Sequence, residues 1–469
     1  MSGEARCAVN KGGRLAILLW SVLLVVLVVA GVLLARLCEL EKPTVVLASD
    51  VTVLGSKTPL AIAFQDEKSG IREIEASVTQ DTKKVMVLDR KNSRKGFLTP
   101  GGPRRMEEST VIDVKSLGLI DGPAQLVVTA RDFSLWGWLK GNTTTLIHPV
   151  EIDAKPPRLS LLDSPLFLKA ATAGTVVYQA SEPLSAHGVV LNGYFHPGHP
   201  LPARGKDVYV ALIAVPHDAE AITEANLTGR DLAGNESTVG MKLGYRKARL
   251  KTDTITISDD FLTQKVPEFA QHHPEMAGTP IEQFLYVNRE VRRKNAAHIV
   301  QLCGQSQPER LWDGRFNRMH RSSQSAGFAE LRTYLYNGQQ MAQEFHLGVD
   351  LASLRFSDVE AANRGRVVFA DYLGIYGNMV LIDHGLGVFS LYSHLSQLTV
   401  KAGDQVEKGA RIGKTGMTGM AGGDHLHFSM LVNGIFVDPL EWWDLNWLTV
   451  NITDYLKGAP PAPSSAPSS

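Results

Sequence analysis

The sequence predicts a mainly β, multidomain chain that begins with a membrane-spanning helix. Three observations support this prediction. An uncharged apolar run lies near the N-terminus, short β-branched runs separated by turn clusters fill residues 43 to 246, and residues around a C-terminal histidine pair alternate between polar and apolar. At 469 residues the chain is also too long for one ordinary domain, which averages about 150 residues. Several separate cores are therefore expected.

Charge and cysteine content exclude some classes of function. The number of Lys plus Arg equals that of Asp plus Glu, at 48 each. The chain as a whole therefore carries no net positive charge that would favour binding to nucleic acid or to an acidic partner. The three cysteines, Cys7, Cys38 and Cys303, lie far apart in the chain and do not suggest an intrachain disulfide framework. No Cys-His signature surrounds Cys303, which we expect to be a small buried residue and not a nucleophile.

The first predicted element is a transmembrane anchor at residues 15–37. Its run LAILLWSVLLVVLVVAGVLLA contains no charge, and about 20 such residues span a bilayer core as a helix. The run is longer than the apolar part of a signal peptide, and the flanking ARLCEL lacks a small-x-small cleavage pattern. A retained anchor in the cytoplasmic membrane is therefore expected.

Charges beside this run predict its orientation. Residues 1–14 carry Arg6, Lys11 and Arg14 against the single acid Glu4, so the positive-inside rule places the N-terminus in the cytoplasm. The remainder of the chain then lies outside the membrane, which means the periplasm where the host has an outer membrane.

Two β-sandwich modules are predicted next, at residues 43–153 and 154–246. Runs such as PTVVLAS, PLAIAF and AQLVVTA alternate with turn clusters such as DEKSG. The first module ends in LVVTARDFSLWGWLKGNTTTL and the second in EANLTGRDLAGNESTVGMKL, which share Arg-Asp followed by Gly-Asn. The two modules resemble the immunoglobulin-like domains of bacterial surface proteins. The favoured role of the two modules is to space the C-terminal part of the chain from the membrane, and docking to cell-wall enzymes or envelope proteins is an alternative.

Residues 247–312 are predicted to form a helical connector. The stretch IEQFLYVNREVRRKNAAHIVQL places apolar residues near helical spacing with charges between them. The low-complexity tail at residues 458–469, rich in Pro, Ser and Ala, is expected to be disordered.

The histidine pair in DHLHFSM raises the question of a metal or substrate site. His425, His427 and Ser429 alternate with apolar residues, so a β-strand would direct all three to one face. Taken alone, an HxH pair is weak, because paired surface histidines are common.

Further ligands could come from HLGVD, in which His346 and Asp350 stand four residues apart. Gly348 and Val349 favour a loop entering a strand over a helix, so local chain geometry would have to bring the two together. Two imidazoles and one carboxylate with an open position are typical of catalytic zinc, whereas structural zinc usually needs cysteines.

The motifs HLGVD, LYSHL and DHLHF, in that order, resemble those of the LytM-type M23 zinc endopeptidases, the lysostaphin-like family. The resemblance extends over roughly residues 313 to 442 and implies an antiparallel-β peptidase domain, placed at 313–445. It implies that His346, Asp350 and His427 bind Zn²⁺ and that His394 and His425 serve catalysis. His384, in IDHGLG, matches a position with no catalytic role in the family and is expected to be structural.

The resemblance also implies a function and its rivals. The chain would be a membrane-anchored zinc metalloendopeptidase that hydrolyses peptide cross-links of bacterial peptidoglycan, so its partners would be stem peptides and the bilayer. Some relatives have instead lost zinc ligands and activate cell-wall amidases without enzymatic activity. A third possible function is that of a scaffold in envelope assembly that has retained the metal-site residues.

Two departures from the family pattern bear on the site. Ser429 stands where many members have glutamate, so support for the ligands can differ. LRFSDVEAANRG replaces a short Gly-Thr-Pro turn after HLGVDLAS and is expected to reshape one wall of the groove.

Overall fold

The computed structural model describes residues 11–96, 101–248 and 251–457. The chain divides into two compact units, one of residues 1–156 with 232–235 and one of residues 157–231 with 236–469. The predicted disordered tail at 458–469 lies outside the described residues, as does most of the predicted cytoplasmic segment.

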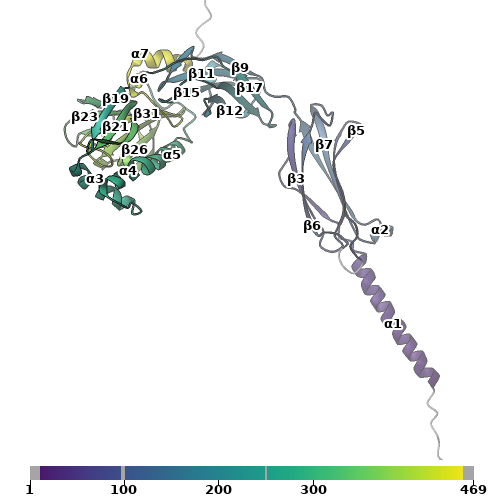
Figure 1. The fold of residues 1–469 in the computed structure, drawn as a ribbon. Coiled ribbons are helices and arrows are strands. Elements are labelled where there is room, and N and C mark those ends of the chain that lie inside the picture. Colours follow the sequence, from purple (N-terminus) through teal and green to yellow (C-terminus); the bar gives the residue numbers. More distant parts are fainter. Residues whose placement is uncertain (1–10, 97–100, 249–250, 458–469) are drawn as a thin grey trace, which may run out of the picture. The chain divides into compact units, whose positions relative to one another are not determined.

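The first unit begins with the single long helix α1 (Lys11–Leu37), drawn in purple in Figure 1. Its window Ala16–Leu33 has a mean hydropathy of 3.0 and is long and apolar enough to cross a membrane. A helix of this kind near the N-terminus is consistent with a membrane anchor or a signal sequence.

The first module consists of β-strands and one short helix. Its elements are β1 (Thr44–Leu47), β2 (Val53–Leu54), β3 (Lys57–Gln65), β4 (Ile71–Gln80), β5 (Lys83–Lys91), β6 (Arg105–Asp113), β7 (Gly122–Asp132), α2 (Trp136–Leu139) and β8 (Thr143–Ile152). They form a three-stranded sheet, β1-β3-β6, and a five-stranded sheet, β2-β8-β7-β4-β5. Alternate residues of β7 are buried, among them Leu126, Val128 and Ala130, as expected for a strand with one face on a core.

The second module is also built from strands. They are β9 (Leu159–Asp163), β10 (Phe167–Lys169), β11 (Ala173–Ala180), β12 (Leu184–Leu191), β13 (Tyr194–Pro197), β14 (His199–Pro200), β15 (Val208–Ala214), β16 (Ala225–Asp231), β17 (Glu236–Gly240) and β18 (Gly244–Arg246), with the 3-10 turn η1 (Pro202–Arg204). Two four-stranded sheets, β14-β15-β11-β9 and β13-β12-β16-β17, account for most of them. Both modules are thus β-structures, as the alternating runs predict.

Residues 251–302 differ in part from the predicted helical connector. The segment opens with a strand, β19 (Lys251–Thr256), which pairs in parallel with β21 (Glu330–Tyr336). Helices follow as predicted: α3 (Asp259–His272), α4 (Pro280–Tyr286), the π-helical turn η2 (Val287–Val291) and α5 (Arg292–Leu302). The sequence KTDTIT contains only one apolar residue, Ile255, so neither an apolar run nor a polar–apolar alternation marks this strand. Cys303, after α5, is buried as predicted.

The C-terminal domain is centred on a large antiparallel sheet. The strands of the whole domain, not all of which belong to this sheet, are β20 (Ser323–Ala326), β21, β22 (Gln339–His346), β23 (Val349–Ala352), β24 (Asp358–Glu360), β25 (Gly365–Tyr372), β26 (Asn378–Asp383), β27 (Val388–Leu395), β28 (Gln397–Leu398), β29 (Gln405–Val406), β30 (Arg411–Lys414), β31 (Leu426–Val432) and β32 (Ile435–Val437). The eight-stranded sheet runs β20-β23-β31-β27-β26-β25-β29, with β32 beside β31, and the 3-10 turn η3 (Gly374–Tyr376) precedes β26. Every strand pair within this sheet is antiparallel.

Helical structure continues beyond residue 445, where the predicted domain ends. It consists of α6 (Pro439–Trp443), α7 (Leu445–Leu448), the π-helical turn η4 (Thr449–Thr453) and α8 (Asp454–Leu456). This segment joins the second module to the large C-terminal sheet. Glu441, which is 7% exposed, accepts a hydrogen bond of 2.6 Å from Thr172 and pairs with Lys169 at 2.7 Å.

The two parts also share an apolar core. Ala173 and Leu212 of the second module belong to the same buried cluster as Trp442 and Ile452. Asn433, after β31, donates a 2.8 Å hydrogen bond to the carbonyl of Leu212. The second module is therefore packed against the C-terminal domain, which the spacer interpretation did not anticipate.

Trp442 offers a test of this shared core. The side chain is fully buried against Phe316 and Trp312, so Trp442→Ala should lower the free energy of unfolding of this unit by about 3–5 kcal/mol. Leu440, on the same helix, is 45% exposed, and Leu440→Ala should cost no more than about 0.5 kcal/mol. Urea unfolding of both variants gives the comparison, and equal losses would contradict the packing described.

Candidate metal centre

Strand register brings the three sequence motifs together. β31 lies between β23 and β27, and His427 on β31 is directly opposite Asp350 on β23 and Ser393 on β27. His346 is the last residue of β22, and only two residues separate it from Val349, where β23 begins. The predicted loop-to-strand geometry of HLGVD and the predicted strand at HxH are both observed.

A β-bulge directs His394 towards this site. Asn378 is opposite Leu395 and Val380 is opposite Tyr392, so Met379 alone faces the two residues between them on β27. Regular alternation would place the side chains of Ser393 and His394 on opposite faces. His394 instead adopts φ of 63°, which is costly for a residue other than glycine, and such strain is concentrated at functional sites.

Three ligand atoms of the predicted metal site converge. His346 Nε2 lies 2.9 Å from Asp350 Oδ1 and 2.9 Å from His427 Nδ1, and His427 Nδ1 lies 3.0 Å from Asp350 Oδ1. Each of these residues is less than 9% exposed. The three atoms lie within 4.8 Å of one another, as donors around a single ion would.

The hydrogen bonds on the far side of each ring fix which atoms can bind a cation. His346 Nδ1 is 2.7 Å from the carbonyl of Gly327, so this nitrogen carries the proton and Nε2 is left as an acceptor. The Ser429 hydroxyl donates to the carbonyl of Leu347 at 2.7 Å, so its oxygen can accept from His427 Nε2, 3.1 Å away.

It follows that two imidazole lone pairs and one carboxylate oxygen face one another with no hydrogen between them. Three such acceptors repel each other unless a cation lies among them, so the residues present fit a divalent metal ion. Ser429, which replaces the family's usual glutamate, performs the supporting function for His427.

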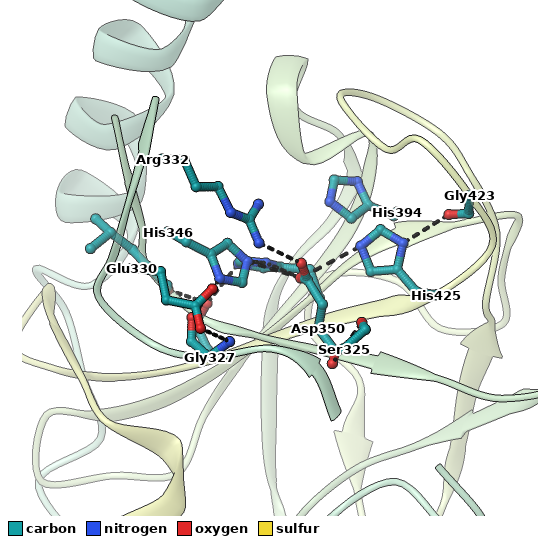
Figure 2. Close-up of polar contacts among 12 residues, drawn as sticks. Ser325, Gly327, Glu330, Arg332, His346, Asp350, His394, Gly423 and His425 are labelled. Atoms are coloured by element: carbon teal, nitrogen blue, oxygen red, sulfur yellow. Dashed lines mark hydrogen bonds and ion pairs between the residues drawn. The ribbon is translucent and has the colours of Figure 1, made fainter. Parts of the chain in front are cut away.

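The second oxygen of Asp350 has a different partner. Figure 2 shows Arg332 reaching Asp350 from β21, and the Arg332 guanidinium donates to Asp350 Oδ2 at 2.9 Å. This contact leaves Oδ1 directed at the two histidines. The sequence gives no signal for Arg332, because the pairing of β21 with β22 alone brings it to the site.

Burial and the Asp350 charge govern the pKa values in the centre. Burial acts to raise the pKa of Asp350, but its close contacts with the rings of His346, His425 and His427 hold it well below its usual range. Burial lowers the pKa of His427 to about 4, although the nearby Asp350 carboxylate acts to raise it. Burial, together with the neighbouring His425 and His427, also lowers the pKa of His394. Burial acts to lower the pKa of His425, but the contact with the Asp350 carboxylate and its charge raise this pKa by more, so the net shift is upward.

The two predicted catalytic histidines lie beside the three converging atoms. His425 Nδ1 is 2.8 Å from the carbonyl of Gly423, and its Nε2 points towards Asp350 Oδ1 at 3.5 Å (Figure 2). His394 Nδ1 is 2.8 Å from the carbonyl of Thr418, and the ring centroids of His394 and His425 are 4.9 Å apart. Each ring thus holds its Nδ1 proton on a carbonyl and leaves Nε2 for the site.

His384 is separate from this cluster. Its Nδ1 donates to the carbonyl of Arg364 at 2.7 Å and its Nε2 lies 2.7 Å from the hydroxyl of Ser390. The ring packs edge-on against Phe316, and burial lowers the pKa of His384 to about 4, so it stays neutral. These contacts agree with the predicted structural role.

A cavity of about 960 Å³ opens onto the centre. All five predicted site residues line it, together with Tyr376. Part of the opposite wall comes from the predicted connector, through Phe261 of α3, Phe284 of α4 and Arg292 of α5. Residues 259–302 therefore help to shape the cavity, a function that the sequence did not indicate.

Helix α3 also holds the glycine-rich loop beside HxH. Lys265, 4% exposed, donates to the carbonyl of Met417, and Glu268 accepts from the backbone N–H of Gly419 at 2.5 Å. Thr418 lies between these two anchors and supplies the carbonyl that binds His394. The middle of this loop is thus hydrogen-bonded on both sides of Thr418.

The insertion LRFSDVEAANRG lies at the edge of the same loop. Leu354 is 83% exposed, and the backbone N–H of Phe356 donates to Asp424 just before the histidine pair at 3.2 Å. The insertion therefore contacts the segment that leads into HxH, in agreement with the predicted change to the groove wall.

Comparison with known proteins identifies this part of the chain. Residues 344–439 match the family described as Peptidase family M23. The DD-carboxypeptidase/endopeptidase Mpg of Neisseria meningitidis serogroup B is 40% identical over 96 residues, 20% of this chain and 22% of the relative. The peptidoglycan DD-endopeptidase ShyC of Vibrio cholerae is 36% identical over 115 residues, 24% of this chain and 26% of the relative.

A regulator is also among the relatives. The murein hydrolase activator EnvC of Escherichia coli is 34% identical over 106 residues, 22% of this chain and 25% of the relative. The chain spans about a quarter or less of the length of these three curated relatives.

The acceptor geometry predicts which variants lose metal. We expect His346→Ala and His427→Ala to weaken Zn²⁺ binding by more than about 100-fold, since each removes a converging lone pair. His320→Ala, which alters a histidine with a 77% exposed side chain in the same domain, should bind as the wild type does. Titration calorimetry with Zn²⁺ makes the comparison, and wild-type affinity in both cluster variants would contradict the assigned ligands.

Proposed function

From the premise that the C-terminal part of the chain is an M23 peptidase domain, we propose that the protein is a membrane-anchored zinc metalloendopeptidase acting on peptide cross-links of bacterial peptidoglycan. One observation carries the proposal. Three buried acceptors, from His346, Asp350 and His427, converge without a proton between them beside two further histidines that face the same cavity.

The donor set favours zinc among the common cations. Two neutral imidazoles and one carboxylate match the ligands of catalytic zinc sites, and no cysteine lies in the group. A zinc ion held by these residues would supply Lewis acidity, which polarises a peptide carbonyl and promotes attack by water near neutral pH.

His394 and His425 would perform the proton transfers. Each directs Nε2 into the site, because its Nδ1 proton is held by the carbonyl of Thr418 or Gly423. In the neutral form this Nε2 can accept a proton from water, and in the protonated form it can donate to the developing oxyanion or the leaving amine. We propose both as catalytic residues, without dividing these roles between them.

The dimensions of the cavity suit a peptide. About 960 Å³ accommodates several residues of an extended chain, with carbonyl-polarising groups at the centre and aromatic residues Phe261 and Phe284 on the wall. The relatives named as a peptidoglycan DD-endopeptidase and a DD-carboxypeptidase/endopeptidase support a cell-wall stem peptide as the substrate.

The location follows from the N-terminal segment. Helix α1 would anchor the chain in the cytoplasmic membrane, with Lys11 and Arg14 on the cytoplasmic side. Both modules and the peptidase domain would then face the cell wall, in the periplasm of a host with an outer membrane.

The resemblance to EnvC supports a second candidate, a regulator that binds and activates cell-wall amidases. Such a regulator needs no converging acceptors, so metal content and catalysis distinguish the two functions.

The decisive experiment is digestion of purified cross-linked sacculi by the zinc-loaded full chain in detergent. We expect new amine ends and cleaved dimers in the muropeptide mass spectrum, lost in His427→Ala together with bound zinc. His394→Ala and His425→Ala should retain zinc but lose about 10²- to 10⁴-fold in kcat. Zinc-loaded protein that leaves sacculi intact but stimulates an added amidase would establish the regulator instead.

A second prediction concerns the contact between α3 and the glycine-rich loop. Lys265→Met removes the donor to Met417, so Thr418 should shift and the His394 ring with it. Because small displacements of catalytic groups are costly, kcat should fall about 10- to 100-fold while KM and zinc content stay nearly constant. This split between kcat and KM marks a positioning residue.

The matched control is Glu290→Gln, which alters a half-exposed helical glutamate that pairs with Arg293. It should leave kcat, KM and zinc content unchanged. If Lys265→Met behaves in the same way, α3 does not position the catalytic histidine.

A further inference from the structure

A further converging group, made of three carboxylates, lies in the first module, far along the chain from the peptidase motifs. Glu39, Asp66 and Asp132 are 4%, 5% and 0% exposed, and one oxygen of each lies within 4.8 Å of the others. They come from three separate places: the segment after α1, the turn after β3 and the last residue of β7.

Two of these carboxylates are held in place by local hydrogen bonds. Asp132 Oδ1 accepts from the backbone N–H of Asn142 at 2.7 Å and of Ser134 at 3.0 Å, and its Oδ2 accepts from the Asn142 amide at 2.8 Å. Asp66 Oδ1 accepts from the backbone N–H of Gly70 at 2.6 Å. Both side chains are therefore fixed before any ligand arrives.

Glu39 brings a free oxygen to this group. Its Oε1 accepts from the Ser69 hydroxyl at 2.8 Å, but its Oε2 is buried and has no hydrogen-bond partner among the described residues. A buried, unpaired carboxylate oxygen costs free energy unless it is protonated or binds a cation. This oxygen is the observation that points to a ligand.

The surroundings do not neutralise the three charges. Among the described residues, the groups that hydrogen-bond to these carboxylates are hydroxyl, amide and backbone N–H groups, and none is a lysine or an arginine. Burial, followed by the charges of Asp66 and Asp132, raises the pKa of Glu39 to about 7. Within the described part of the chain, the cluster is therefore a group of three carboxylates to which no basic side chain is hydrogen-bonded.

We propose that Glu39, Asp66 and Asp132 bind one Ca²⁺ ion. All the ligand atoms on offer are hard oxygens, which favour Ca²⁺ or Mg²⁺ over zinc. The three oxygens lie within 4.8 Å of one another, close to the spacing of ligands that share one ion at Ca–O distances of roughly 2.3–2.6 Å. Mg²⁺ keeps several of its waters and usually binds through only one or two carboxylates, whereas Ca²⁺ accepts a larger set of protein oxygens.

The site would fasten the segment after α1 to the first module. The Asn142 amide already donates to the carbonyls of Glu39 and Glu41 at 3.0 Å each, and the Ser134 hydroxyl donates to that of Glu39 at 3.0 Å. An ion shared by Glu39, Asp66 and Asp132 adds a charged cross-link at the same place. The junction between the helix and the module would then be stiff when Ca²⁺ is bound.

The rival occupant is a proton shared between Glu39 and its neighbours. The test uses the zinc-loaded full chain in detergent, dialysed to equilibrium against ⁴⁵Ca²⁺ and, separately, heated with and without millimolar CaCl2. We expect one saturable Ca²⁺ per chain and a higher Tm of the first module with CaCl2. Glu39→Gln and Asp66→Asn should each weaken binding at least about 10-fold and remove the Tm response.

Two controls make the outcome specific. Glu107→Gln alters an exposed carboxylate on β6 of the same module and should bind Ca²⁺ as the wild type does. His346→Ala should do the same, which separates this site from the peptidase centre. Wild-type protein without saturable Ca²⁺ binding, or wild-type binding in both Glu39→Gln and Asp66→Asn, would overturn the proposal and leave a shared proton as the explanation.

Discussion

The site depends on one constraint, which is that Asp350 and His427 face each other across neighbouring antiparallel strands. This register fixes the carboxylate and one imidazole at the spacing of two ligands, and the end of β22 adds the ring of His346. A shift of one residue would turn His427 to the other side of the sheet. The buried strands on both sides of β31 prevent such a shift, because the same residues that set the register also fill the core.

Around this centre, each ligand is oriented by a group that contacts the polar atom of its side chain that faces away from the converging atoms. Gly327 supports His346, Ser429 supports His427 and Arg332 supports Asp350. Gly348 also belongs to this arrangement, since a Cβ atom there would lie 2.5 Å from His427 Nε2. These contacts hold each side chain so that its free lone pair points towards the centre. The ligands are therefore preorganised, and a metal ion would not have to reorient them on binding.

The sequence predicted the local features well and the long-range ones poorly. Alternation around His427 and the glycine in HLGVD were enough to predict strand geometry, and three motifs in order indicated which residues to bring together. Nothing local marks Arg332, which reaches Asp350 through a hairpin, or Lys265, which contacts a loop about 150 residues away in the chain. The strand β19 was missed because its exposed face is polar, and the docking of the second module was missed because tertiary contacts leave no periodic pattern.

The packing of the second module against the C-terminal helices has a consequence for folding. The contacts Thr172–Glu441 and Thr175–Asn451 join residues separated by 269 and 276 positions, and contacts of such long sequence separation are slow to form because loop closure costs entropy. During synthesis the strands of the second module emerge long before the C-terminal helices that cover them. Part of the apolar surface of these strands therefore stays exposed until the end of the chain has been made. Maturation of the peptidase unit is thereby tied to completion of the polypeptide, and a nascent chain stopped before α6 would lack the cover over Ala173 and Leu212.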